Sequence, residues 1–149
     1  MSRRTGVLVA ALFAISLFFA APLPKDDLTR LNGTWKVTSF KIAGVELIGG
    51  ENQSEIILTF KNGKFEWPGN DGQPGRVASI NSTKTPKQIT YEYIEGDNKG
   101  KIHNAIYILD RDTFTDCFGD FGEDWPTEFK STEENKLTML VYKRVNKVD

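Results

Sequence analysis

Cysteine and histidine are both scarce in this chain of 149 residues, which contains one of each, Cys117 and His103. A single thiol cannot form a disulfide within the chain, so the fold must be stabilised by packing alone. Zinc sites need several histidine or cysteine ligands, and one of each is too few. Nucleophilic catalysis of the serine or cysteine type would have to use His103, but no nucleophile elbow or related motif flanks it or Cys117. We therefore predict no catalytic residue, no metal site and no cofactor.

Structural roles are the simpler interpretation of these two residues. Cys117 is expected to be a small buried apolar residue, since cysteine is among the most buried residue types. His103 is expected to be an ordinary strand residue, either exposed or hydrogen-bonded. The two would face each other only in one particular register of the hairpin that contains them.

An excess of charge of one sign is also missing, because 19 basic residues stand against 20 acidic ones. No dense stripe of lysine and arginine occurs along the chain. Binding to nucleic acid or to anionic lipid depends on such a basic surface, so we expect neither as a partner. The acidic residues form two groups, Asp110, Asp112 and Asp116, and Asp120, Glu123 and Asp124. Neither group matches the twelve-residue calcium loop, and we expect both to be solvated acidic loops.

One stretch of the chain is strongly apolar, Val7 to Ala21, and it is 15 residues long. A helix that spans a membrane needs about 20 such residues. Arg3 and Arg4 precede the stretch and prolines follow it, which is the order of a secretory signal peptide. We therefore predict that residues 1–21 are a signal peptide and that the protein is secreted or periplasmic. The alternative is a retained N-terminal anchor, and a membrane would be involved only in that case.

Residues 26–146 are expected to form one domain of short alternating segments separated by turn residues. A helical turn over Asp26–Leu31 comes first, with an aspartate as its N-cap. Strands are expected at Thr34–Ile42, Val45–Ile48, the hairpin Glu55–Trp67, Arg76–Ile80, Gln88–Ile94, Lys101–Leu109, Thr113–Phe118 and Leu137–Val145, with irregular loops at Pro68–Gly75 and Gly119–Pro126. Many short strands with little helix are typical of an all-β sandwich or barrel. Closure into an antiparallel barrel of about eight strands would remove exposed sheet edges.

The clearest local signal is the hairpin around Asn62-Gly63. These two residues tolerate positive φ at both central positions, as a type I′ turn requires. A two-residue loop makes Lys61 face Lys64 and Phe60 face Phe65, which places both aromatic side chains on one face of the sheet. A slip of one residue would separate Phe60 from Phe65, so the register is predicted as well as the turn.

Bulky aromatic residues fall on the predicted inner faces of the strands. A barrel of eight strands is just wide enough to be filled by side chains or to hold one small ligand. Pocket lining and core look alike in sequence, so both interpretations stay open. In the first, the protein is a non-enzymatic module that binds a small apolar ligand. The candidate ligand-binding residues are Phe60, Phe65, Trp67, Tyr91, Tyr93 and Tyr107.

Two more aromatic residues, Phe121 and Trp125, lie in the loop expected beside the barrel mouth. Aromatic side chains of this kind are favoured as anchors at protein interfaces. The alternative function is therefore an envelope or secreted interaction module, or an inhibitor, that uses these loops against an unknown protein partner. An enzyme is the third hypothesis, and the scarcity of histidine and cysteine argues against it.

Five segments carry a resemblance to a known family over nearly all of residues 26–146. They are Leu31–Trp35, Gly100–Tyr107, Asp112–Cys117, Pro126–Ser131 and Leu140–Arg144. In their order and spacing they resemble the lipocalin-like domain of unknown function found in exported proteins of planctomycete bacteria. That family usually has glycine where this chain has Ala105, and arginine where it has Trp125. The resemblance implies a lipocalin-like antiparallel barrel and export, but no activity, because none is established for the family.

The resemblance also implies structural roles for Gly33, Trp35 and Arg144. A Gly-x-Trp sequence opens the first strand of lipocalin-like barrels, and here it begins at Gly33. In such barrels the tryptophan lies across the closed end, with a basic residue of the last strand over its ring. That residue would be Arg144 or, as the alternative, Lys143. Trp35 is therefore expected to close the barrel and not to contact a ligand.

Overall fold

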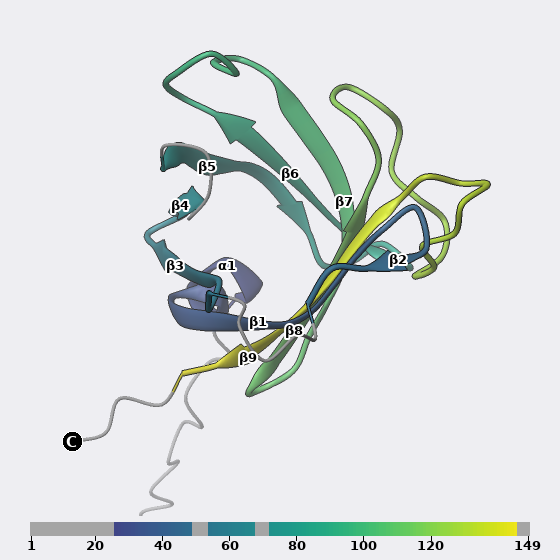
Figure 1. Cartoon of the computed structure of the whole chain (residues 1–149). Helices are drawn as coiled ribbons and strands as arrows, with labels where there is room; N and C mark the ends of the chain where they lie inside the picture. The colour runs from purple at the N-terminus through teal and green to yellow at the C-terminus, as the bar shows by residue number, and fades with distance from the viewer. Residues whose placement is uncertain (1–25, 49–53, 68–71, 146–149) are drawn as a thin grey trace, which may run out of the picture.

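The computed structural model describes residues 26–48, 54–67 and 72–145, which form a β-structure with one short helix (Figure 1). The predicted signal peptide and part of the predicted loop 68–75 lie outside the described residues. No helix among the described residues is long and apolar enough to cross a membrane. The elements in chain order are α1 (Asp27–Leu31), β1 (Gly33–Ile42), β2 (Val45–Glu46), β3 (Ile57–Lys61), β4 (Lys64–Trp67), β5 (Gln73–Asn81), β6 (Lys87–Tyr93), β7 (Ile102–Leu109), β8 (Thr113–Phe118) and β9 (Thr138–Arg144).

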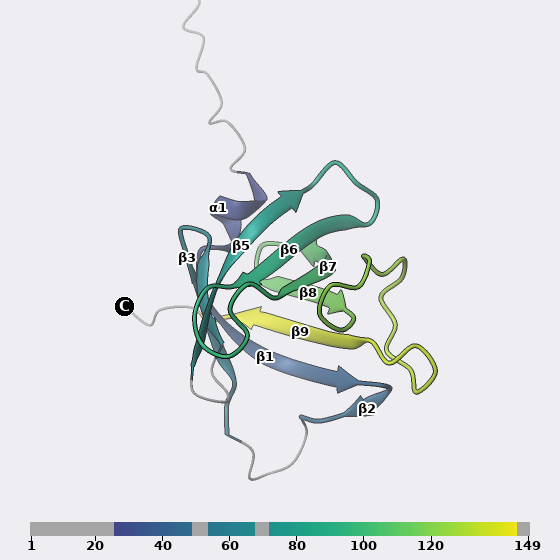
Figure 2. The same cartoon turned by 90° about the horizontal axis from the view of Figure 1, so that it is seen from above.

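Eight of these strands close into an antiparallel barrel. β1 pairs with β3, each later strand pairs with the next as far as β9, and β9 pairs with β1 again. The short strand β2 pairs with the end of β1 and lies outside this closed circuit (Figure 2). Closure gives each of the eight strands a hydrogen-bonded neighbour on both sides. The prediction of an all-β antiparallel barrel with a short N-terminal helical turn is confirmed.

The hairpin of β3 and β4 has the predicted register. Asn62 and Gly63 have φ angles of 51° and 75°, the positive values that a type I′ turn needs. Phe60 pairs with Phe65, and Lys61 pairs with Lys64. Both rings are buried in the barrel, and their centroids are 5.7 Å apart. The alternation of apolar and polar residues therefore set the register correctly.

β5 begins earlier than its turn residues suggest. Gln73, Pro74 and Gly75 were expected in a loop, but they belong to β5. Pairing with β4 on one side and with β6 on the other outweighs their local preference for turns. Gly75 lies opposite Phe65, and a Cβ atom at Gly75 would overlap the phenyl ring. The glycine therefore makes room for an aromatic side chain of the barrel interior.

Gly75→Ala is expected to destabilise the protein by about 1–3 kcal/mol, because the added methyl group must displace Phe65 from a packed position. Urea unfolding of the two proteins measures the difference in the free energy of unfolding. Ser79→Ala, a change at an exposed position of the same strand, is the control and should alter stability by less than about 0.5 kcal/mol. Equal stabilities of wild type and Gly75→Ala would show that Phe65 does not need the space over the glycine.

Trp35 closes the end of the barrel next to α1. Its side chain is fully buried, and its indole N–H donates to the carbonyl of Leu31 at 2.8 Å. The guanidinium of Arg144 lies 4.1 Å from the ring centroid. Trp35 and Arg144 are register partners on β1 and β9, so their side chains share the inner face of the sheet. Lys143 is one residue away, pairs with Lys36 and therefore points to the other face.

A buried carboxylate, that of Asp27, joins α1 to the same end of the barrel. It accepts hydrogen bonds from the Tyr107 hydroxyl at 2.8 Å, from the Lys87 ammonium at 2.9 Å and from the Arg30 guanidinium at 2.8 Å. Burial acts to raise the pKa of Asp27, but these donors outweigh it and hold the pKa below its ordinary value. The α1 end of the barrel is therefore closed by packed and fully hydrogen-bonded groups.

Candidate functional site

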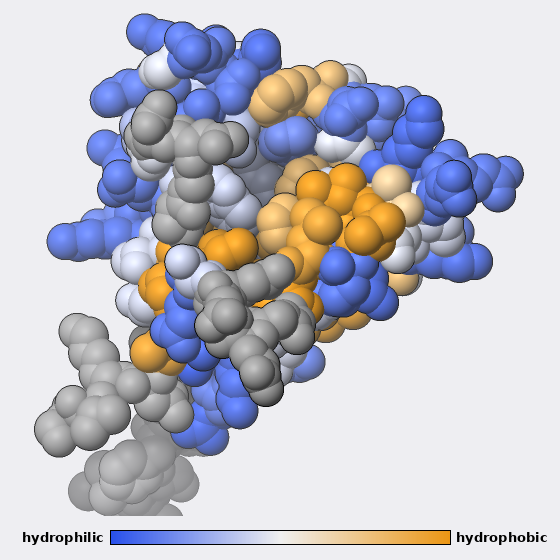
Figure 3. All heavy atoms as spheres, viewed as in Figure 1, coloured by the Kyte–Doolittle hydropathy of each residue, from blue (hydrophilic) through white to orange (hydrophobic). Residues whose placement is uncertain are grey.

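A cavity opens inside the barrel at the end away from α1, which is the end that faces the viewer in Figure 1. The cavity is narrow, with a volume of about 50 Å³. Apolar atoms gather in the middle of this face, with hydrophilic residues around them (Figure 3). The interior is therefore neither completely filled nor a wide cup.

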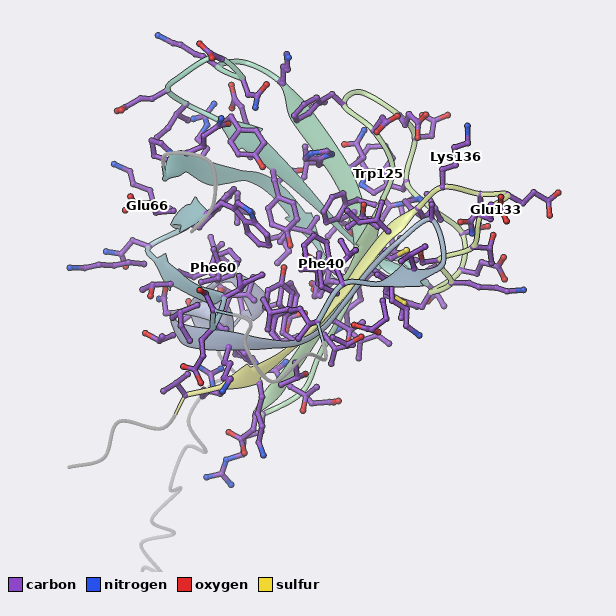
Figure 4. The ribbon with its side chains drawn as sticks, viewed as in Figure 1. Phe40, Phe60, Glu66, Trp125, Glu133 and Lys136 are labelled. Carbon is purple, nitrogen blue, oxygen red and sulfur yellow. The ribbon has the colours of Figure 1, made fainter. Side chains whose placement is uncertain are left out.

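Five of the six aromatic residues proposed from the sequence line this cavity, namely Phe60, Phe65, Trp67, Tyr91 and Tyr93. Their strands place alternate side chains inward, and in Figure 4 Phe60 points into the barrel whereas Glu66 points away from it. The sixth, Tyr107, lies at the α1 end, where its hydroxyl is bonded to Asp27. It is part of the packed closure and not of the cavity.

The aromatic rings around the cavity contact each other edge to face. The centroid of the Phe65 ring lies 5.5 Å from that of Tyr91 and 6.4 Å from that of Tyr93. Such arrangements stabilise aromatic pairs beyond the area they bury and hold the rings in place. The cavity wall is therefore a set of supported rings around a narrow space.

Five further residues line the cavity that were not among the ligand-binding candidates, and Asp116 is the most informative of them. Asp116 is only 2% exposed, and its Oδ2 atom accepts a hydrogen bond from the Tyr91 hydroxyl at 2.8 Å. Its Oδ1 atom is buried and has no hydrogen-bond partner among the described residues. The Tyr142 hydroxyl also lies close enough to lower the pKa of the carboxyl group, although Oδ1 accepts no hydrogen bond from it. The others are Leu58, which alternation also predicts to face inward, His103, Phe118 and Tyr142.

The expectation of a solvated acidic loop is wrong for Asp116. Asp110 and Asp112 are exposed in the turn between β7 and β8, but Asp116 lies four residues further along β8 on its inner face. A signal was present in the sequence, because Asp116 alternates with Phe114 and Phe118 on one face of the strand. Among the described residues, no group of three or more His, Cys, Asp or Glu side chains is placed to hold a metal ion.

Burial changes the ionisation of the groups in this cavity. Desolvation raises the pKa of Asp116 to about 7, and the hydrogen bond from Tyr91 only partly opposes it. Desolvation and the nearby Asp116 carboxylate also raise the pKa of Tyr91 and of Tyr142 well above the usual tyrosine range. At neutral pH both tyrosines therefore keep their protons, while Asp116 is poised between its neutral and charged forms.

His103 lies at the mouth of the cavity between two phenylalanine rings. Its ring centroid is 4.3 Å from that of Phe121 and 4.7 Å from that of Phe118, and its Nδ1 donates to the carbonyl of Gly119 at 3.0 Å. Burial lowers the pKa of His103 below its ordinary value. Cys117 is fully buried on the opposite face of the sheet, because it pairs with Ile106 in the register of β7 and β8. The two residues therefore form no Cys–His pair.

A second hollow lies on the outer surface, between the loop 82–87 and the end of β7. Its volume of about 440 Å³ is larger than that of the barrel cavity, and it is more open to solvent. The polar groups of its Lys87 and Tyr107 are already bonded to Asp27. The barrel cavity, with its unsatisfied Asp116 oxygen, is therefore the stronger candidate for a binding site.

Comparison of the chain with models of protein families, with curated proteins and with solved structures finds no match in any of the three. The resemblance to the planctomycete lipocalin-like domain stays a prediction. What the cavity binds has to be inferred from its own side chains.

Proposed function

We propose that this protein is an exported, non-enzymatic, lipocalin-like barrel that binds one small and mainly apolar ligand in the cavity away from α1. The cavity itself is the observation that supports this most directly, since aromatic side chains meet around a space that they do not fill. Apolar pockets with a few well-placed polar groups are the ordinary form of small-molecule sites. Trp35 closes the other end, so a ligand would enter past Trp67, Tyr93 and His103.

The dimensions of the cavity limit the ligand. The cavity volume of about 50 Å³ is well below the ordinary range for ligand pockets, so a ligand would have to be small and lie partly in the open mouth. One aromatic ring or a short branched chain suits such a space better than a sterol or haem. We therefore expect ligands of roughly the size of indole, p-cresol or benzyl alcohol.

Small aromatic ligands are expected to raise the melting temperature of the protein. At a ligand concentration of about 100 times Kd the stabilisation should be about 2.7 kcal/mol. Tyr93→Leu removes a half-buried ring from the mouth and should weaken binding by about three- to tenfold, the usual strength of aromatic contacts. Thermal shift gives the first result, and calorimetric titration gives the change in Kd.

Trp125→Ala is the matched control for this experiment. Trp125 is 37% exposed and does not line the cavity, so its loss should leave Kd unchanged. If none of indole, p-cresol and benzyl alcohol binds to the wild-type protein, the proposed binding function is wrong.

The alternative is a protein-interaction module that uses Phe121 and Trp125, which are 40% and 37% exposed. Phe121 stacks on His103, and the Lys101 ammonium lies over the Phe121 ring, 5.0 Å from its centroid. These contacts connect Phe121 to the cavity mouth, and they favour a role at the ligand entrance. Weaker ligand binding in Phe121→Ala than in Trp125→Ala would support that role over a common protein-binding surface.

A further inference from the structure

One polar atom in the barrel interior is left without a hydrogen bond. Among the described residues, Oδ1 of Asp116 is the one buried side-chain nitrogen or oxygen that has no protein partner. The same side chain lines the cavity, and its other oxygen is held by Tyr91. The carboxyl group is therefore anchored on one side and has acceptor capacity left on the other.

The surroundings of this oxygen favour a positive partner. No lysine or arginine is among the residues that line the cavity. The aromatic rings present faces of negative electrostatic potential, which attract cations. His103, the remaining group in the lining that could carry a positive charge, has a pKa below its ordinary value because it is buried. A ligand with a positive charge would thus meet attraction from both Asp116 and the rings.

We propose that the ligand of this cavity is a compact primary or secondary amine, bound as its ammonium ion, whose N–H group donates to Oδ1 of Asp116. This proposal rests on the function proposed above, that the cavity binds a small ligand. The apolar part of the amine would lie against the rings of Phe65, Tyr91 and Tyr93, which line the same space. A buried carboxylate beside a cation forms a charge-assisted hydrogen bond, which is stronger than a bond between neutral groups.

The same geometry discriminates against other ligand classes of equal size. A neutral alcohol can donate to Asp116 but gains no attraction between charges. A carboxylate ligand would bring a second negative charge next to Asp116 in a desolvated site, so that one of the two carboxyl groups would have to stay protonated. Short fatty acids are therefore expected to bind poorly, although their chains would suit the apolar walls.

Three ligands of nearly equal size test this inference: benzylamine, benzyl alcohol and benzoate. The wild-type protein should bind benzylamine about tenfold more tightly than benzyl alcohol, which is the difference between a charge-assisted and a neutral hydrogen bond. Benzoate should be the weakest of the three. Calorimetric titration at about pH 8, where the pKa of about 7 leaves Asp116 mostly ionised, gives the three values of Kd.

Asp116→Asn keeps the shape of the side chain and an acceptor oxygen for Tyr91 but removes the charge. It should bind benzyl alcohol as wild type does and should lose the preference for benzylamine. Asp110→Asn is the matched control, because Asp110 is exposed at the opposite end of the barrel, and it should keep that preference. Circular dichroism checks that both variants are folded.

The wild-type protein alone provides a second measurement in case Asp116→Asn does not fold. Its affinity for benzylamine should fall about tenfold from pH 8 to pH 6, because Asp116, with a pKa of about 7, becomes protonated. The affinity for benzyl alcohol should stay level. The other titratable groups around Asp116 are Tyr91 and Tyr93 on β6, Tyr107 and His103 on β7, Cys117 on β8 and Tyr142 on β9. The tyrosines and the thiol have raised pKa values and stay neutral, and burial lowers the pKa of His103 and so favours its uncharged form.

The outcomes separate this inference from the proposed function. If none of the three ligands binds to the wild-type protein, the proposed function itself is wrong. If benzyl alcohol binds but benzylamine binds no more tightly, the amine inference is overturned while the binding function stands. Persistence of the amine preference in folded Asp116→Asn, or an affinity for benzylamine that does not change with pH, would overturn it in the same way.

Discussion

Asp116→Asn is expected to abolish most of the loss of stability that the wild-type protein shows as the pH rises from about 5 to about 8. The pKa of Asp116 is raised from 3.8 to about 7 in the folded protein because the carboxyl group is buried. Between these two values the folded protein holds a proton that the unfolded chain has released. Stability therefore falls as the pH rises through this interval, since the native state then binds more protons than the unfolded state. A shift of about three pKa units corresponds to about 4 kcal/mol.

Urea unfolding at pH 5 and at pH 8 measures this effect. Asp116→Asn cannot ionise, so at pH 8 it should be more stable than wild type by up to about 4 kcal/mol. At pH 5, little more than one unit above the ordinary value of 3.8, the difference should be about 1.5–2 kcal/mol. The lowered pKa values of Asp26, Asp27 and Glu46 act at more acidic pH and lie outside this interval. His103 titrates in both proteins and cancels in the comparison. Parallel pH profiles for wild type and Asp116→Asn would show that the buried carboxyl group is not the cause.

Trp35→Ala is expected to destabilise the protein by about 3–5 kcal/mol, because it removes a large, fully buried side chain and leaves a cavity. The indole contacts the ring of Phe114, at 5.9 Å between centroids, and donates to the carbonyl of Leu31. Its loss would also leave the guanidinium of Arg144 without the ring below it. A change of this size is a large fraction of the stability of a domain of this length.

The same substitution at an exposed tryptophan is the control for this prediction. Trp125 is 37% exposed, and Trp125→Ala should change the free energy of unfolding by less than about 0.5 kcal/mol. Urea unfolding of the three proteins under one condition gives both differences. Comparable losses in Trp35→Ala and Trp125→Ala would mean that Trp35 does not close the barrel end.

Arg144 joins Trp35 to the chain segments around it at the closed end of the barrel. Besides lying over Trp35, its guanidinium donates to the carbonyls of Arg30, Asn32 and Arg111 at 2.7, 2.9 and 3.0 Å. Gly33 has a φ of 130°, which side chains of L-residues rarely adopt, and a Cβ atom there would also come within 2.8 Å of the same guanidinium, so glycine is favoured at that position. The Gly-x-Trp sequence and the final strand are therefore parts of one closure, although more than 100 residues separate them.

The lining of the cavity could be predicted only in part from the sequence. Alternation along the strands identified Phe60, Phe65, Tyr91 and Tyr93 as inward-facing residues, and the structure brings all four to the cavity. The same alternation included Tyr107, whose inward position is at the opposite end of the barrel. Period-two alternation distinguishes the two faces of a strand, but it contains no information on depth along the barrel axis.

Asp116 shows a different limit. Its neighbours in sequence, Asp110 and Asp112, indicate a solvated acidic turn, whereas its place on an apolar strand face indicates burial. The composition of the segment suggested the first interpretation, and the register of β8 in the barrel makes the second correct. Its pKa could not be predicted from the sequence, because it depends on desolvation by side chains of β6 and β9.

The sequence by itself determined the local features of this protein: the strands, the type I′ turn at Asn62-Gly63 with its register, and the inward faces of the interior aromatic residues. These follow from backbone preference and alternation, which act over a few residues. Only the tertiary structure decided that Gln73–Gly75 joins the sheet, that the interior keeps a narrow space, and that the Asp116 carboxyl group is buried in it with one oxygen free among the described residues. Those features depend on how strands that are distant in the sequence meet when the sheet closes. No short segment of the chain contains that information.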